Sequence, residues 1–197
     1  MIDEEQFPRK NWSQYYGDLK EELPHDCPRS LGNEFVIQVF VDADFAGDRI
    51  TRRSRTGFMV MLNNAPIYWF SKKQTSCETS TFGSKFVAMK IFCEYLKGLW
   101  IRLRQMGMLV QNPCYVYGDN QSVLCNTCIP DSMLKKKTSR VAYNFVREGV
   151  SCDMWRTTYI KTVDNPADVL TKSLPAGSNR KRKVRMMLYN IYPEGND

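Results

Sequence analysis

The stretch Phe35-Val-Ile-Gln-Val-Phe-Val-Asp-Ala-Asp-Phe-Ala-Gly-Asp48 decides the fold. It begins as an apolar, β-branched run, which predicts a buried β-strand from about Glu34 to Asp42. A buried strand that ends in carboxylates holds negative charge at one point, as an oxygen-liganded cation such as Mg²⁺ requires. Asp44 and Asp48 are interpreted as loop residues, because the Ala-Gly pair between them indicates that the chain is already turning away from the strand.

Two further acids lie in comparable places along the chain. Asp119 ends the strand-like run Tyr115-Val-Tyr-Gly-Asp119, and Asp168 follows Asn165-Pro-Ala at the start of a predicted helix. We expect these two aspartates to converge with Asp42, because acids from separate strand ends and a helix start are suited to hold a hard divalent cation.

The remaining pattern predicts a mixed sheet with helices on its faces, in the order β-β-β-α-β-α-α-β-α. Its best-defined element is a helix that begins near Phe82 and ends before Gly107, with apolar residues at i, i+3 and i+4. Thr79-Ser-Thr81 offers hydroxyls that cap this helix. The other predicted elements are strands at 57–62, 67–71, 114–117 and 155–160, a turn at 63–66, and helices ending at 126, 148 and 172.

Composition narrows the function class. The chain has 197 residues, which fits one domain, and 43% of them are hydrophobic, enough for a packed core. Its net charge of +7 favours a polyanionic partner, although a merely soluble basic protein has the same charge. The seven cysteines are irregularly spaced and the chain shows no signal-peptide pattern, which indicates a reducing, intracellular setting. It also has no apolar run of about 20 residues, so no membrane partner is expected.

Six motifs in this order resemble the RNase H domain that ends the Pol polyprotein of copia-type retrotransposons. The resemblance implies an α/β RNase H-like fold, a mixed five-stranded sheet flanked by helices. It also implies a connector from a preceding reverse transcriptase domain at 1–33, the RNase H-like domain at 34–174 and a basic tail at 175–197. The motifs are Val41-Asp-Ala-Asp-Phe-Ala-Gly-Asp48, Thr51-Arg-Arg-Ser-Arg-Thr-Gly57, Ile67-Tyr-Trp-Phe-Ser-Lys-Lys-Gln74, Tyr117-Gly-Asp-Asn-Gln-Ser122, Phe145-Val-Arg-Glu148 and Asn165-Pro-Ala-Asp-Val-Leu-Thr-Lys172.

The resemblance also implies a reaction and its site. Family enzymes hydrolyse the RNA strand of an RNA–DNA hybrid with two Mg²⁺ ions, for which Mn²⁺ can substitute, held by four carboxylates. Three of these carry over as catalytic and metal-binding residues, namely Asp42, Asp119 and Asp168. The fourth, a glutamate on the long helix, is replaced by Lys85. We therefore expect weakened metal affinity and impaired catalysis. Asn144 is a second departure, at a position where family members often carry histidine.

Two alternatives stay open at this point. A nearby acid such as Glu78 would keep the enzyme active as a substitute ligand, whereas Glu94 lies too far along the helix. Alternatively, the domain serves only as a nucleic-acid-binding or interaction module. The connector is open to a second interpretation too, since its tyrosines and tryptophan would also suit a surface patch that covers the domain.

The expected partner is an RNA–DNA hybrid or another nucleic acid, together with the ancestral reverse transcriptase domain. The expected compartment is the cytoplasm, within a virus-like particle, or the nucleus. Basic clusters beside aromatic side chains favour a groove that follows phosphates. The residues predicted to contact nucleic acid are Arg52, Arg53, Arg55, Lys72, Lys73, Asn120, Gln121 and Lys136.

Overall fold

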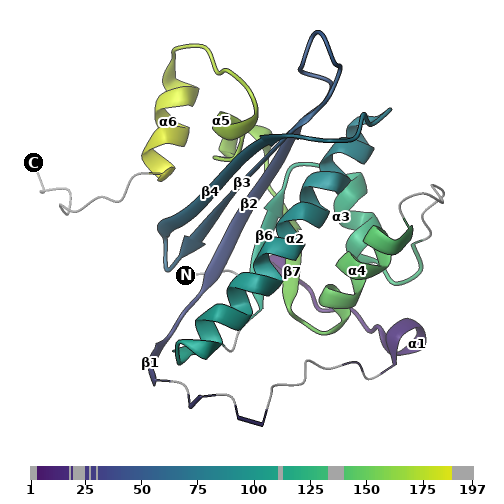
Figure 1. Cartoon of the computed structure of the whole chain (residues 1–197), viewed down its shortest axis with the longest axis vertical. Coiled ribbons are helices and arrows are strands. Elements are labelled where there is room, and N and C mark those ends of the chain that lie inside the picture. Colours follow the sequence, from purple (N-terminus) through teal and green to yellow (C-terminus); the bar gives the residue numbers. More distant parts are fainter. Residues whose placement is uncertain are drawn as a thin grey trace, which may run out of the picture.

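A five-stranded mixed sheet organises the chain in the computed structural model, which describes residues 4–17, 19, 25–26, 28–29, 31–110, 113–132 and 140–187 (Figure 1). The strand order is β4-β3-β2-β6-β7, with β2 antiparallel to β3 and parallel to β6. The strands are β2 (Ile37–Asp44), β3 (Arg55–Leu62), β4 (Ala65–Lys73), β6 (Cys114–Gly118) and β7 (Trp155–Tyr159).

The central strand β2 starts three residues later and ends two residues later than predicted. It continues through Asp42 to Asp44, because Asp42 pairs with Gly57 and Asp44 with Arg55 on the antiparallel neighbour β3. Asp44 is therefore the last residue of the strand and not a loop residue. Most of β2 is buried, as expected for a central strand that is covered on both faces.

The hairpin between β3 and β4 turns through two residues. Asn63 and Asn64 have φ values of 48° and 68°, the left-handed conformation that a two-residue hairpin favours. The turn is thus shorter than the predicted 63–66. Pro66 lies within β4, at the edge of the sheet, where a missing N–H is tolerated.

Helix α2 (Thr81–Gln105) packs along β2 and β3 and forms the centre of the core. Ser80 caps its N-terminus by accepting a hydrogen bond from the backbone N–H of Gly83, which confirms the predicted cap. Its apolar face, which includes Phe92 and Leu96, is buried. The helix ends before Gly107, whose φ of 74° allows the chain to turn.

The two faces of the sheet carry different helices (Figure 1). With α2 on one side are α3 (Gln121–Cys128) and α4 (Arg140–Ser151). On the other side, α5 (Asp168–Thr171) packs against β2, β3 and β4, and α6 (Ser178–Met187) contacts α5. The fold class predicted from the sequence, an α/β mixed five-stranded sheet flanked by helices, is confirmed. None of the helices in the described ranges is long and apolar enough to cross a bilayer.

Several short elements were not predicted, since tertiary contacts hold them and their own periodicity is weak. They are the parallel pair β1 (Leu31–Glu34) and β5 (Met108–Leu109), the 3-10 turns η1 (Glu4–Gln6) and η3 (Thr162–Asp164), the single turn α1 (Ser13–Tyr16), and α6.

The N-terminal segment packs on the body of the domain. Phe7 is buried, with its ring edge-on to Tyr115 and Tyr117 at centroid distances of 4.8 and 5.4 Å. Trp12 is also buried, and the guanidinium of Arg147 lies 4.8 Å from its ring centroid. The burial of Trp12 agrees with the interpretation of the N-terminal tyrosines and tryptophan as a patch that covers the domain, whereas the burial of Phe7 was not predicted. The boundaries at 33/34 and 174/175 stay predictions.

Candidate metal and nucleic-acid site

Asp42 lies near the end of β2, where helix α5 approaches the sheet unusually closely. Its register partner on β3 is Gly57, and a Cβ there would come within 2.6 Å of Cγ2 of Thr171 and 2.9 Å of Cβ of Leu170. Any larger residue at this position would therefore push α5 away from the strand. The glycine lets α5 bring its side chains to Asp42.

Asp168 is placed by a buried asparagine in the loop before α5. The side-chain N–H of Asn165 donates to the carbonyl of Val41 at 3.0 Å, and its Oδ1 accepts from the N–H of Ala167 at 3.1 Å. Because Asn165 is fully buried, these hydrogen bonds fix the loop against the end of β2. As a result, Asp168 begins α5 directly beside Asp42.

Asp119 reaches the same point from the neighbouring parallel strand. Val41 of β2 pairs with Gly118 of β6, so that Asp119 follows immediately beyond the sheet. The next residue, Asn120, caps α3 by accepting from the N–H of Val123 at 3.0 Å, which turns the chain away. The carboxyl ends of two parallel strands thus carry two of the aspartates.

The structure brings the three predicted aspartates together. Asp42, Asp119 and Asp168 each offer one carboxylate oxygen, and these oxygens all lie within 4.8 Å of one another. Within the described part of the chain, this is the only group of three or more His, Cys, Asp and Glu side chains close enough to hold a metal ion.

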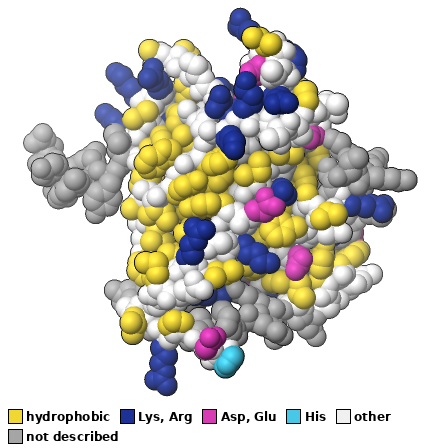
Figure 2. Space-filling model, viewed as in Figure 1, with side chains coloured by type: hydrophobic (Ala, Val, Ile, Leu, Met, Phe, Trp, Pro, Cys, Tyr) yellow, Lys and Arg dark blue, Asp and Glu magenta, His cyan; other side chains and the backbone are white. Residues whose placement is uncertain are grey.

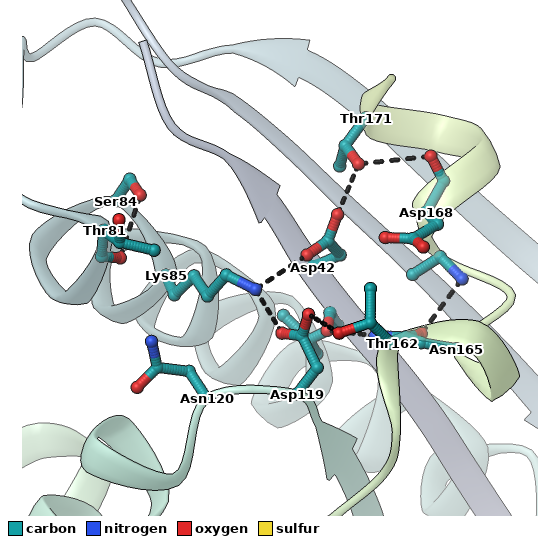
Figure 3. Close-up of polar contacts among 12 residues, drawn as sticks. Asp42, Thr81, Ser84, Lys85, Asp119, Asn120, Thr162, Asn165, Asp168 and Thr171 are labelled. Carbon is teal, nitrogen blue, oxygen red and sulfur yellow. Dashed lines mark hydrogen bonds and ion pairs between the residues drawn. The ribbon is translucent and has the colours of Figure 1, made fainter. Parts of the chain in front are cut away.

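Lys85 points from the first turns of α2 into the space between two of these aspartates (Figure 3). Its Nζ lies 3.2 Å from Oδ1 of Asp42 and forms an ion pair with Oδ1 of Asp119. The helix start is held by Gln74, whose buried Nε2 donates to the carbonyl of Ser84 at 2.8 Å. The ammonium group therefore takes the place of the acid that the motif pattern predicts there.

Threonine hydroxyls hold the second oxygen of the same two aspartates. Thr171 of α5 donates to Oδ2 of Asp42, and Thr162 of η3 donates to Oδ2 of Asp119 at 3.1 Å (Figure 3). Each carboxylate is thereby oriented with Oδ1 toward Lys85.

Asp168 is paired with two further lysines. Nζ of Lys172 lies 2.8 Å from its Oδ1 and 3.7 Å from Oδ2 of Asp42. Lys183 of α6 forms an ion pair with its Oδ2 and also donates to the carbonyl of Thr162 at 2.7 Å. Lys183 is fully buried, whereas 38% of the Lys172 side chain is exposed.

These contacts shift the pKa values in different directions. Burial opposes the charge on Asp42, but Lys85, Thr171 and Lys172 together hold the pKa of its carboxyl below the usual value. Burial raises the pKa of Asp168, and Lys172 and Lys183 offset only part of this effect. Burial opposes the charge on Lys172 as well, yet its hydrogen bond to Asp168 and the charge of Asp42 hold its pKa above the usual value.

The cluster fits a metal ion only in part. Carboxylate oxygens are the donors that Mg²⁺ and Mn²⁺ prefer, and the three aspartates supply them. An ammonium ion has no lone pair to donate, so Lys85 is not a ligand and repels a cation. Glu78 and Glu94 are not members of the cluster. The carboxylate of Glu78 accepts a hydrogen bond from Ser76 at 3.2 Å, and that of Glu94 pairs with Lys90 at 2.7 Å.

The predicted basic residues gather beside the end of β2. Arg55 and Lys73 are register partners on β3 and β4, Arg55 pairs with Asp44 of β2, and Lys72 is exposed. Arg52 and Arg53 are exposed on the loop between β2 and β3. Figure 2 shows Lys and Arg side chains gathered at the end of the molecule that carries this loop and α6.

The other predicted contact residues lie in mixed settings. Gln121 is exposed at the start of α3, whereas the side chain of Asn120 is used as a helix cap. Asn144 is exposed on α4. Lys136 lies outside the described residues, as do the first three positions of the helix predicted over 137–148.

Two residues of the cluster carried little signal in the sequence. Lys183 stands in a run of basic residues that predicts a solvated surface, and only the packing of α6 shows that it is buried. Thr162 belongs to no motif, and its role depends on the short turn η3. Thr171 and Lys172, by contrast, stand within the Asn165-to-Lys172 motif, which would have identified them as neighbours of Asp168.

Curated proteins similar to this chain are transposon polyproteins, although no protein-family model matches it. The retrovirus-related Pol polyprotein from transposon TNT 1-94 of Nicotiana tabacum is 32% identical over 154 residues, 76% of this chain and 11% of the polyprotein. That from transposon RE2 of Arabidopsis thaliana is 30% identical over 155 residues, 78% of this chain and 11% of the polyprotein. The chain thus spans about a tenth of the length of these relatives.

Solved structures with a similar fold are RNase H domains. LC11-RNase H1, isolated from compost by a metagenomic approach, superposes with a TM-score of 0.54 at 15% identity, over 69% of this chain and 92% of its own. The same enzyme in complex with an RNA/DNA hybrid gives a TM-score of 0.53 at 14% identity, over 68% of this chain and 93% of its own. The chain is therefore homologous to a part of copia-type, retrovirus-related Pol polyproteins, and the fold of that part is the RNase H fold.

Proposed function

We propose that this domain binds RNA–DNA hybrids and that its hydrolysis of the RNA strand is impaired, because Lys85 occupies the divalent-metal site. The observation that carries the proposal is the position of Nζ of Lys85, which contacts carboxylate oxygens of both Asp42 and Asp119.

The electrostatic effect of this lysine is large enough to matter. Replacing a glutamate by a lysine changes the local charge by two units. At about 4 Å and an effective dielectric constant near 20, each pair of unit charges interacts by about 4 kcal/mol before screening. A divalent ion must therefore displace the Lys85 ammonium from two aspartates or bind beside it against repulsion. Either route weakens the affinity for Mg²⁺ or Mn²⁺.

The rest of the site supports hybrid binding. The convergence of Asp42, Asp119 and Asp168 supports a site whose shape is retained although its charge is changed. Arg52 and Arg53 are exposed on the loop that follows β2, Lys72 is exposed near the end of β4, and all three carry the charge that phosphates attract. An RNase H1 with a similar fold has been solved with an RNA/DNA hybrid. We extend this substrate class to the present chain, with a reverse transcriptase domain of the same polyprotein as its partner and the cytoplasm or nucleus as its place of action.

The test is cleavage of a labelled RNA–DNA hybrid in Mg²⁺ and in Mn²⁺ by the unmodified protein, by Lys85→Glu and by Lys85→Glu/Asp42→Asn. The proposal predicts that Lys85→Glu cleaves at least about tenfold faster than the unmodified protein, the factor that 1.4 kcal/mol of barrier provides. The added Asp42→Asn change should abolish this gain. Cleavage by the unmodified protein at the rate of Lys85→Glu would overturn the impairment, and a substitute ligand would then have to exist.

A further inference from the structure

We infer that Lys85, Lys172 and Lys183 act as internal counterions of the aspartate cluster, so that the domain binds RNA–DNA hybrid without a divalent cation. The inference rests on the proposed hybrid binding and adds how the acidic site is made compatible with a polyanion. Its basis is the balance between three carboxylates and three ammonium groups in direct contact.

Every carboxylate oxygen of the cluster lies against a lysine ammonium or a threonine hydroxyl, and only Oδ1 of Asp168 makes its contact, the ion pair with Lys172, without hydrogen-bond geometry. Oδ1 of Asp42 and Oδ1 of Asp119 face Lys85, and their Oδ2 atoms accept from threonine hydroxyls. Both oxygens of Asp168 face lysines. A metal ion that entered this cluster would have to displace the existing contacts of the carboxylates. In an acidic site without lysines, the ion would bind carboxylate oxygens that have no competing ammonium group.

Two of the three lysines are held in place by burial. Lys183 is fully buried on α6 and has a second acceptor, the carbonyl of Thr162, while only 14% of the Lys85 side chain is exposed. They come from α2 and α6, far apart in the sequence, so the pairing is a property of the folded domain. Lys172 is the most exposed of the three and is the one that can turn toward a phosphate.

Neutralisation has a consequence for nucleic-acid binding. Three uncompensated carboxylates at the end of β2 would repel the phosphates that the neighbouring Arg52 and Arg53 attract. With lysines in contact, that repulsion is removed by the protein itself. In Lys85→Glu it would return, and a metal ion would be needed to remove it.

The experiment measures the dissociation constant of a fluorescein-labelled RNA–DNA hybrid by anisotropy, in EDTA and in Mg²⁺ at equal ionic strength. The dissociation constants of the unmodified protein in the two buffers should differ by less than about twofold. Lys85→Glu should bind about tenfold more weakly in EDTA and recover in Mg²⁺, given its change of two charge units in the site. Circular dichroism confirms that each variant is folded. If Lys85→Glu does not fold, Lys85→Gln replaces it, and this variant should lose less affinity for the hybrid in EDTA.

Lys90→Glu is the matched control, since Lys90 lies on the same helix and pairs at the surface with Glu94. It should have a small effect that is equal in both buffers. Binding of the unmodified protein that requires Mg²⁺ would overturn the counterion role but leave hybrid binding intact. Absence of binding in both buffers would overturn the proposed function itself. Equal losses for Lys85→Glu and Lys90→Glu would show that the charge at position 85 does not neutralise the cluster.

Discussion

At the scale of single residues, a buried lysine holds one aspartate of the cluster in place. Lys183 is fully buried, and its ammonium contacts the carboxylate of Asp168 and the carbonyl of Thr162. A buried charge of this kind is stable only while its partners are present, because each charge has lost its hydration. Helix α6 thus contributes a residue to the cluster.

Lys183→Met is predicted to destabilise the domain by about 3 kcal/mol, the lower part of the range for breaking a buried ion pair, because Lys172 still faces Asp168. Chemical denaturation measures the change in the free energy of unfolding. Lys181→Met is the control, since Lys181 is exposed on the same helix and should change it by less than about 0.5 kcal/mol. Equal effects of the two variants would contradict the buried role of Lys183.

Asp48 provides a prediction about pH. Its carboxylate pairs with Lys73 and accepts from the N–H of Thr51 at 2.7 Å, and these contacts hold its pKa well below the usual value. A carboxyl group whose pKa is lower in the folded state stabilises the fold above its unfolded pKa, near 4. This contribution is lost as the pH falls toward the folded-state pKa.

In Asp48→Asn, the decline in unfolding free energy below about pH 4 should therefore be shallower than in the unmodified protein. Urea denaturation from pH 2.5 to 7 measures both curves. Parallel curves over the whole range would show that the contacts of Asp48 do not favour its ionised form.

The sequence predicted the site residues that motifs carry and missed those that only packing brings in. Asp42, Asp119 and Asp168 follow recognisable strands or a helix start, and Lys85 stands out because an acid is expected there. The contact of Lys183 with Asp168 depends on a turn and a helix whose positions no local pattern specifies.

At the scale of elements, the long helix and the five strands were predictable because their apolar periodicity is strong. The extent of β2 was not, since its last two residues are held by pairing with β3. The N-terminal segment was open to two interpretations because it has no period at all. Its docking depends on two aromatic side chains, Phe7 and Trp12, which the fold covers.

Phe7→Ala is predicted to destabilise the domain by about 3–5 kcal/mol, the cost of removing a buried phenylalanine from a packed site. Thermal and chemical denaturation measure the loss. Trp69→Ala is the control, because Trp69 is 64% exposed on β4 and should contribute little to the unfolding free energy. A loss for Phe7→Ala no larger than that for Trp69→Ala would show that the N-terminal segment does not stabilise the domain.

At the scale of the whole molecule, the net charge of +7 is unevenly distributed. The aspartates are balanced by internal lysines, so the surface near the site is governed by Arg52, Arg53 and Lys72. Phosphate contacts of this type are strong at low salt and weaken as counterions compete.

Arg52→Gln/Arg53→Gln should make the dependence of log Kd on log salt concentration shallower by about 1 to 2 units, as expected from the loss of up to two phosphate contacts. Anisotropy titrations at several salt concentrations give the slope. Arg102→Gln, at the far end of α2 from Lys85, should leave it unchanged. A slope that responds equally to both changes would place the nucleic acid elsewhere or indicate a diffuse charge effect.

The most direct test of the central claim, that the Lys85 ammonium takes the place of a divalent cation, is a calorimetric titration of Mn²⁺ into the unmodified protein and Lys85→Glu. We expect no saturable binding to the unmodified protein at millimolar Mn²⁺, binding to Lys85→Glu, and loss of that binding when Asp119→Asn is added. Equal affinity of the unmodified protein and Lys85→Glu for Mn²⁺, abolished in both by Asp119→Asn, would contradict the claim.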